Sequence, residues 1–294
     1  MKLKSMTSVI TKSALVLAAC ASLNSFAGTS APSAKGGKAV IPPVVEDGAL
    51  FDTVGATLEV GYDTRYYFRG LWFADNTTWA GLSLSVPLTE QLSLGFGALY
   101  TSTVDTLVNV AGADQALDYS ELDLSASLTY DAGFAKLGLV YTHYEFFDSF
   151  SGRTGAGQFN TTDETGVGAA EEVGATIATS VGPVNLYGGF FYDLTIGASY
   201  AEIGADAPIE INSWLSLVPA VKLGYGFTNY YTAFPVSNQS GLTHVIPTLS
   251  APIKLTKSAT LTPYVAYNIS LDTRHTNNTQ DSEFFGGVKL GVTF

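Results

Sequence analysis

The residues from Leu58 to Phe68 read L-E-V-G-Y-D-T-R-Y-Y-F, and their alternation indicates the fold. Successive side chains of a β-strand point to opposite faces, so alternate positions share a face. One face would be mostly apolar and carry Leu58, Val60, Tyr62, Thr64, Tyr66 and Phe68. The other would carry Glu59, Gly61, Asp63, Arg65, Tyr67 and, just beyond, Arg69. One such strand fits a water-soluble sandwich as well as a membrane barrel.

The same alternation recurs to the end of the chain in segments of about ten residues, which is typical of a transmembrane antiparallel up-and-down β-barrel. Asp75-Asn76 is expected to turn the chain after the first strand. The segments 197–205 and 242–253 are weaker, the second because Pro247 and Pro252 remove ladder hydrogen bonds. Ten or fourteen strands are therefore alternatives to the preferred count. Twelve strands are predicted, at about 56–69, 78–88, 92–102, 119–130, 134–146, 170–181, 184–194, 197–205, 215–226, 242–253, 260–271 and 283–294.

The composition agrees with an all-β barrel that is apolar outside and polar inside. Of the 294 residues, 46% are hydrophobic and only 14% are charged. No run of 18 apolar residues occurs, so no membrane-spanning helix is expected. The net charge of −12 disfavours nucleic acid as a partner, and an acidic lumen would favour cations.

The first 27 residues have the features of a secretory signal peptide. Three lysines precede or enter a short apolar segment, and small residues precede Gly28, where cleavage is expected. Removing three lysines and no acid changes the net charge from −12 to −15. Alternatively, the segment Leu17–Cys20 matches a lipobox, at which the chain would be cut and acylated on Cys20. Because Cys20 is the only cysteine, no disulfide framework is expected. We expect a flexible periplasmic leader over 28–53 and the barrel over 54–294.

Aromatic residues lie near the ends of the predicted strands, where membrane barrels carry girdles at the level of the lipid headgroups. One girdle would contain Tyr66, Phe68, Trp72, Phe73, Trp79 and Tyr100, and the other Tyr130, Phe134, Trp214 and Phe294. The expected partners at these positions are outer-membrane lipid and lipopolysaccharide. The terminal Phe294 resembles the end of the strand that the bacterial barrel-assembly machinery recognises.

The segment Tyr66-Tyr67-Phe68-Arg69-Gly70 resembles the signature of a family of outer-membrane porins known as TorF-like or Gcw_chp proteins. These proteins begin their barrel with a strand that ends in an aromatic residue followed by Phe-Arg-Gly. The resemblance covers roughly 56–294, and its specific part is Tyr62–Gly70. It implies a channel with a signal peptide and no established substrate.

Inward-facing charges are the candidate functional residues, and we expect them to line the pore. They could create a transverse field that selects small ions, or pair with one another and fill the interior. Barrel closure would place the first strand beside the last, so we expect Glu59 near Lys289 and Arg65 near Glu283. Many glycines and serines on the inner face favour an open path. The predicted pore-lining residues are Glu59, Asp63, Arg65, Arg69, Glu121, Asp123, Lys136, Glu172, Asp193, Glu202, Lys222 and Lys289.

The sequence therefore predicts a porin-like channel of the outer membrane for small cationic or neutral solutes. A closed barrel that acts through its outer loops, at 103–118, 147–168 and 227–241, is one alternative. An outer-membrane enzyme is another, because a histidine paired with a serine could be catalytic. His143 has Glu145 two residues on instead of a serine, so no catalytic residue is predicted. No histidine has metal-ligand spacing, and neither a metal nor a cofactor is expected.

Overall fold

A computed structural model describes residues 54–105, 107–110, 113–116, 119–147, 168–195, 197–227, 240–271 and 282–294. The expected signal peptide and leader lie outside these ranges, as does most of the expected outer loops at 147–168 and 227–241. The described residues contain no helix that is long and apolar enough to cross a membrane.

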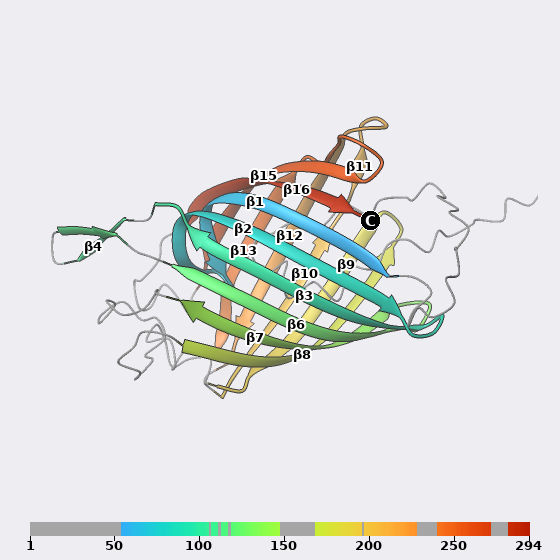
Figure 1. Cartoon of the computed structure of the whole chain (residues 1–294), viewed down its shortest axis with the longest axis horizontal. Helices are drawn as coiled ribbons and strands as arrows, with labels where there is room; N and C mark the ends of the chain where they lie inside the picture. The colour runs from blue at the N-terminus through green and yellow to red at the C-terminus, as the bar shows by residue number, and fades with distance from the viewer. Residues whose placement is uncertain are drawn as a thin grey trace, which may run out of the picture.

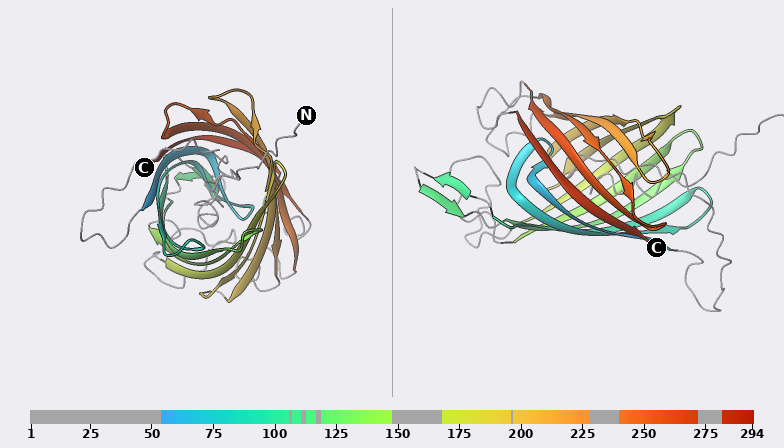
Figure 2. Two further views of the ribbon diagram at one scale, coloured as in Figure 1. Left: turned by 90° about the vertical axis from the view of Figure 1, so that its right-hand side faces the viewer. Right: turned by 90° about the horizontal axis from the view of Figure 1, so that it is seen from above.

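The described chain is a ring of antiparallel strands (Figures 1 and 2). The main sheet has fourteen strands, of which two are additions of two residues each, so twelve form the wall. The first strand pairs with the last, and β10 pairs with β12, which closes the ring. The wall strands are β1 (Gly55–Phe68), β2 (Leu71–Pro87), β3 (Leu92–Thr103), β6 (Ser120–Asp131), β7 (Lys136–Phe147), β8 (Gly168–Val181), β9 (Val184–Asp193), β10 (Ala198–Asp206), β12 (Ser216–Gly226), β13 (Gly241–Ser250), β15 (Ala259–Ser270) and β16 (Glu283–Thr293).

The remaining strands are short and lie at the ends of the barrel. β11 (Ile209–Glu210) pairs with β12, and β14 (Ile253–Lys254) pairs with β15. β4 (Leu107–Val110) and β5 (Ala113–Ala116) form a separate hairpin between β3 and β6. This hairpin stands at one end of the barrel, away from the wall (Figure 1).

The twelve-strand prediction is confirmed, including the two segments with weak patterns. Every wall strand except β2 begins within two residues of its predicted start. The predicted turn at Asp75-Asn76 is wrong, because β2 already begins at Leu71 and the chain reverses at Arg69 and Gly70. Asp75 instead pairs with Arg65 within the β1–β2 ladder.

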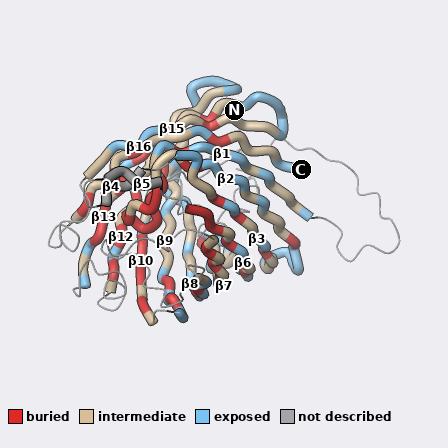
Figure 3. The backbone as a smooth tube through the Cα atoms, turned by 60° about the vertical axis from the view of Figure 1, so that its left-hand side comes forward, coloured by how far each residue is buried: buried red, intermediate tan, exposed pale blue. Residues whose placement is uncertain are grey.

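Alternating burial along the strands separates an apolar exterior from a polar interior (Figure 3). Along β6, for example, Leu124 and Leu128 are exposed, whereas Glu121, Asp123 and Ser127 are buried. The pairing therefore gives one face to the surroundings and the other to the lumen, as the sequence predicted. Five aromatics break the rule: Tyr66, Phe68, Trp72, Phe73 and Trp79 were expected in an outer girdle, but they pack inside the barrel.

Candidate functional site

The tip of the β1–β2 hairpin folds into the lumen instead of continuing the wall (Figure 2). We call the segment Tyr66–Ala74 the hairpin tip. All of its residues except Trp72 are buried. A β-bulge between Tyr66 and Tyr67 shifts the register there, and bulges bend a strand and re-aim its side chains. The bend explains why the predicted alternation fails at this point.

The turn of the tip is built from Arg69 and Gly70. Both have positive φ, at 51° and 75°, which is the backbone of the tight hairpin turn that matches strand twist. Gly70 is required for a second reason. A Cβ at this position would overlap the His244 ring and lie 2.7 Å from the His244 Cβ. On the other side, the Gly70 carbonyl accepts a hydrogen bond of 3.2 Å from the Asn268 side chain.

The tip contacts opposite walls of the lumen with its two faces. One face packs into an apolar cluster with β3, Tyr119 and β7–β10, in which Phe68 lies 5.9 Å from Tyr144 between ring centroids. The opposite face carries Tyr67 and Trp72 and packs against β13, β15 and β16, where Tyr67 lies 5.0 Å from Phe285. The tip therefore reaches from wall to wall in the half of the barrel that contains the β1–β2 turn.

Arg69 is the only charged residue of the hairpin tip. Its two terminal nitrogens donate to the two carboxylate oxygens of Glu172 at 2.6 and 2.7 Å. Its guanidinium carbon lies 4.7 Å from the ring centroids of Phe68 and Phe191 and 4.5 Å from that of Tyr200. Arg69 and Glu172 are each only 3% exposed, so this pair is held out of water. We call the wall residues Glu172, Phe191 and Tyr200 the cation cage.

Tyrosine hydroxyls bind the carboxylates around the tip. Glu121 accepts hydrogen bonds from Tyr66 at 2.9 Å and from Tyr119. Glu172 also accepts one from Tyr144, at 3.3 Å. These donors stabilise carboxylates that would be costly to bury alone.

Asp123 is the exception in this group. It is 1% exposed, and its Oδ1 has no hydrogen-bond partner among the described residues. It also lies close enough to Glu172 for the two carboxyls to interact electrostatically.

The two ion pairs predicted across the seam between β1 and β16 are confirmed. The Lys289 ammonium donates to Glu59 at 2.8 Å, and the Arg65 guanidinium contacts the Glu283 carboxylate. Between these pairs, Asp63 accepts hydrogen bonds from Trp79 at 2.9 Å and from Tyr264 at 2.5 Å.

The other predicted inward charges are distributed around the wall. Lys222 lies 3.8 Å from Glu202, and Lys136 lies 3.4 Å from Asp131. Asp193 accepts a bond of 2.8 Å from the Thr195 backbone at the end of β9. The structure thus brings Arg69 and Glu172 together, with Glu121 and Asp123 near them. Asp193 pairs with Glu172 in the β8–β9 ladder, whereas Lys136 lies elsewhere.

Part of the space expected beside inner-face glycines is filled by neighbouring rings. A Cβ on Gly61 would overlap Trp79, and one on Gly224 would overlap His244 and lie 2.5 Å from the Tyr200 hydroxyl. These glycines therefore permit close packing at their positions instead of leaving open space.

Several residues of the site were missed by the sequence reasoning, above all Tyr66, Phe68 and Phe191. Their alternation along the strand does not reveal them, because the first two belong to a hairpin that bends into the lumen with both faces buried. The third acts through a partner from a distant strand. A retrospective signal is the Arg-Gly pair itself, which suits a positive-φ turn directly after three aromatics.

His143 does not pair with a serine in the described structure. Its Nε2 lies 3.2 Å from Glu145, and its Nδ1 lies 4.0 Å from Glu171. The described residues also contain no group of three or more metal-ligating side chains arranged to hold an ion. These contacts give no support to the enzyme alternative.

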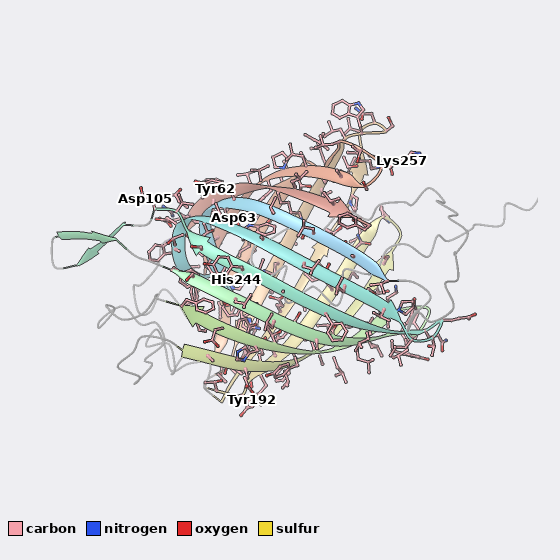
Figure 4. The ribbon with its side chains drawn as sticks, in the orientation of Figure 1. Tyr62, Asp63, Asp105, Tyr192, His244 and Lys257 are labelled. Carbon is pink, nitrogen blue, oxygen red and sulfur yellow. The ribbon has the colours of Figure 1, made fainter. Side chains whose placement is uncertain are left out.

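The labelled side chains of His244 and Asp63 lie on the lumen side of the wall, whereas Tyr192 lies on its outer side (Figure 4).

Comparisons with known proteins find similar barrels. No protein-family model and no curated protein matches the chain. It is similar to an outer-membrane channel from Pseudomonas putida F1 at 15% identity and a TM-score of 0.49, over 82% of this chain and 95% of that one. It is also similar to LpxR from Salmonella typhimurium at 10% identity and a TM-score of 0.48, over 80% and 99% of the two chains. A third similar structure is the translocator domain of the autotransporter NalP from Neisseria meningitidis, at 11% identity and a TM-score of 0.46, over 82% and 88%. At such identities the likeness is one of barrel architecture and says nothing about a solute or an activity.

Proposed function

We propose that this chain is a porin-like channel of the bacterial outer membrane, through which small cationic or neutral solutes diffuse passively. The observation that carries the proposal is the closed ring of twelve strands, apolar outside and charged inside. A closed ring leaves no unpaired strand edge, which is the condition for strands to cross a bilayer. The exposed Leu58, Val60 and Leu139 belong to the lipid-facing side.

In this proposal, the inward charges line the path of the solute. Seven acids and five bases make up the set, so the field inside the lumen favours cations. A twelve-stranded barrel is narrower than the larger porins, which limits the solute to small molecules. The proposed lining residues are Glu59, Asp63, Arg65, Arg69, Glu121, Asp123, Lys136, Glu172, Asp193, Glu202, Lys222 and Lys289.

From the proposed location we also infer which partners contact the outer surface of the barrel. The chain would be exported through the periplasm after loss of residues 1–27 and inserted through the barrel-assembly machinery, with Phe294 at the end of the recognised strand. Phe294 and Phe134 are 78% and 79% exposed, which suits contact with lipid headgroups. Among the aromatics predicted for the girdle at the opposite end, Tyr100 is exposed, which suits contact with lipopolysaccharide.

A second candidate function is favoured by the hairpin tip. Because the tip reaches from wall to wall, the barrel could be closed and act through its outer loops instead. The two candidates differ in one observable, which is whether ions pass.

Single-channel recording in a planar bilayer tests the proposal. We would compare the refolded wild type with a variant in which Tyr66–Ala74 is replaced by Asn-Gly, a dipeptide suited to a tight turn between the paired Arg65 and Asp75. The channel proposal expects discrete openings from the wild type, a cation-selective reversal potential in a salt gradient, and larger steps from the variant. Silence from both proteins, when each is folded and heat-modifiable, would reject the channel and favour the closed barrel.

A further inference from the structure

We infer that the cation cage is a binding site for guanidinium-type cations, that Arg69 occupies it as a tethered ligand, and that a free solute of this class competes with Arg69 and releases the hairpin tip. The inference rests on the proposed channel and names both a solute class and the element that this solute controls. Its basis is the arrangement of one carboxylate and two aromatic rings around a guanidinium.

The cage has the chemistry of a guanidinium site. A guanidinium is planar and offers paired N–H donors, which match the two oxygens of a carboxylate, and its face stacks on aromatic rings. Glu172 supplies the bidentate contact, while Phe191 and Tyr200 supply the aromatic faces. A simple ammonium is more strongly hydrated and cannot form the paired contact. The site therefore discriminates between cations of equal charge.

The cage is held by the wall and not only by the tip. Its three members come from the neighbouring strands β8, β9 and β10. Glu172 receives a hydrogen bond from Tyr144 on β7, and Tyr200 stacks on the His244 ring on β13 with an interplanar angle of 9°. These supports remain if Arg69 leaves, so the vacated cage would keep its form.

Further carboxyl groups lie beside the cage. Asp123 lies near Glu172 and is buried, with one carboxylate oxygen unpartnered among the described residues. Glu121 is two residues away on the same face of β6. Several carboxyl groups therefore lie around the single guanidinium of Arg69.

Exchange explains how a solute would release the tip. Withdrawal of Arg69 alone leaves Glu172 buried without a counterion, which is strongly unfavourable. If a free guanidinium takes the place of Arg69, that cost is removed. Hydrogen bonds of the tip to the wall at Tyr66, Tyr67 and the Gly70 carbonyl involve only neutral groups of the tip. The solute therefore shifts the population toward the released tip by binding only that state.

The first experiment asks whether the cage binds a free guanidinium. In the full-length Arg69→Ala protein the cage is vacant, and guanidinium chloride at millimolar concentration, far below the molar range that unfolds proteins, serves as the probe. We expect it to recover most of the loss in the temperature at which heat-modifiability disappears, whereas equal ammonium chloride or sodium chloride does not. The double variant Arg69→Ala with Glu172→Gln is the matched control and should show no recovery. Equal effects of the three salts, or recovery in the double variant, would overturn the inference.

The second experiment asks whether the free cation competes with Arg69 in the wild type. At a guanidinium concentration about ten times its Kd for the cage, the open probability of single channels should rise about tenfold, because only the released state binds. Equal ammonium should leave it unchanged. The Gly70→Cys, His244→Cys variant provides a lock, because these positions meet closely enough for a disulfide with a small backbone adjustment. The oxidised lock should abolish the response, and reduction of the same sample should restore it.

The outcomes separate the two proposals. Wild-type openings that ignore guanidinium or persist in the oxidised lock would leave the channel standing and reject the tethered-ligand inference. Failure of the wild type and of the tip-replaced variant to conduct would reject the channel. In that case, the recovery measurement on Arg69→Ala would still decide whether the cage binds guanidinium.

Discussion

Two arginine–glutamate pairs in this barrel differ mainly in burial, and they should differ in their contribution to stability. Arg69 and Glu172 are each 3% exposed, whereas Arg65 and Glu283 are 31% and 38% exposed. Glu172→Gln leaves a buried guanidinium without its counterion and should lower the free energy of unfolding by roughly 3 kcal/mol or more. Glu283→Gln should cost less than about 1 kcal/mol, because water screens that pair. Urea unfolding in lipid vesicles measures both, and equal losses would contradict the assigned burial.

Gly70 and Gly133 form a second matched comparison, because both have positive φ, at 75° and 85°. Replacing Gly133 with alanine should cost roughly 1–2 kcal/mol from backbone strain alone, since no atom lies within 4 Å of the added Cβ. Gly70→Ala adds an overlap with the His244 ring, so it should cost roughly 1–3 kcal/mol more. The same unfolding assay applies. A loss at Gly70 no greater than that at Gly133 would show that the tip does not pack against His244.

For single residues, the sequence predicted an ion-pair partner correctly where closure of the barrel determines which two strands lie side by side. The pair of Glu59 and Lys289 was predictable because the first strand of a barrel must lie beside the last, and parity placed both side chains inside. The partner of Arg69 was not predictable. Arg69 reaches Glu172 across the lumen, and that distance depends on the bend of the hairpin and the tilt of the strands, which no local pattern encodes.

At the scale of elements, the hairpin tip shows the limit of period-two reasoning. The aromatics Tyr66, Phe68 and Phe73 resemble a membrane girdle by composition and position. The hairpin bends into the lumen at a bulge and both of its faces become buried, so these aromatics form the core of an inserted element. The Asp75-Asn76 pair also misled the prediction, because it has turn chemistry but lies within the β2 strand.

The outward face of the strands should tolerate charge according to depth in the membrane. Ile203 and Val181 are almost equally exposed, at 62% and 63%. Ile203 lies in the interior of β10 and pairs with Gly188 and Leu223, well inside their strands, whereas Val181 ends β8 beside the turn. Ile203→Arg should therefore cost roughly 2–4 kcal/mol, and Val181→Arg roughly 0–1 kcal/mol. Folding yield and urea midpoints in vesicles test this, and a similar cost at both positions would mean that the exterior does not face lipid.

At the scale of the whole molecule, the sequence predicted the architecture because each strand carries its own alternation. A barrel is a chain of local pairings, so twelve local patterns suffice to propose a closed ring. The packing of side chains inside the lumen could not be predicted in the same way. It depends on one hairpin packing against strands β3 and β7–β10 on one side and β13, β15 and β16 on the other, and such contacts appear only after the ring has closed.

The orientation of the barrel in the membrane is the broadest prediction. Thr293 and Phe294 bond to Ser258 and Ala56, so the chain end, the first strand and the turn around Lys257 share one end of the barrel, and Asp105 lies at the other (Figure 4). Outer-membrane barrels keep both chain ends and their short turns in the periplasm. With Cys20 changed to serine, a cysteine placed by Asp105→Cys should react with a membrane-impermeant maleimide on intact cells. A cysteine placed by Lys257→Cys should react only after the outer membrane is permeabilised. The reverse pattern would put the hairpin tip at the periplasmic mouth, where it would meet solutes leaving the lumen instead of those entering from outside.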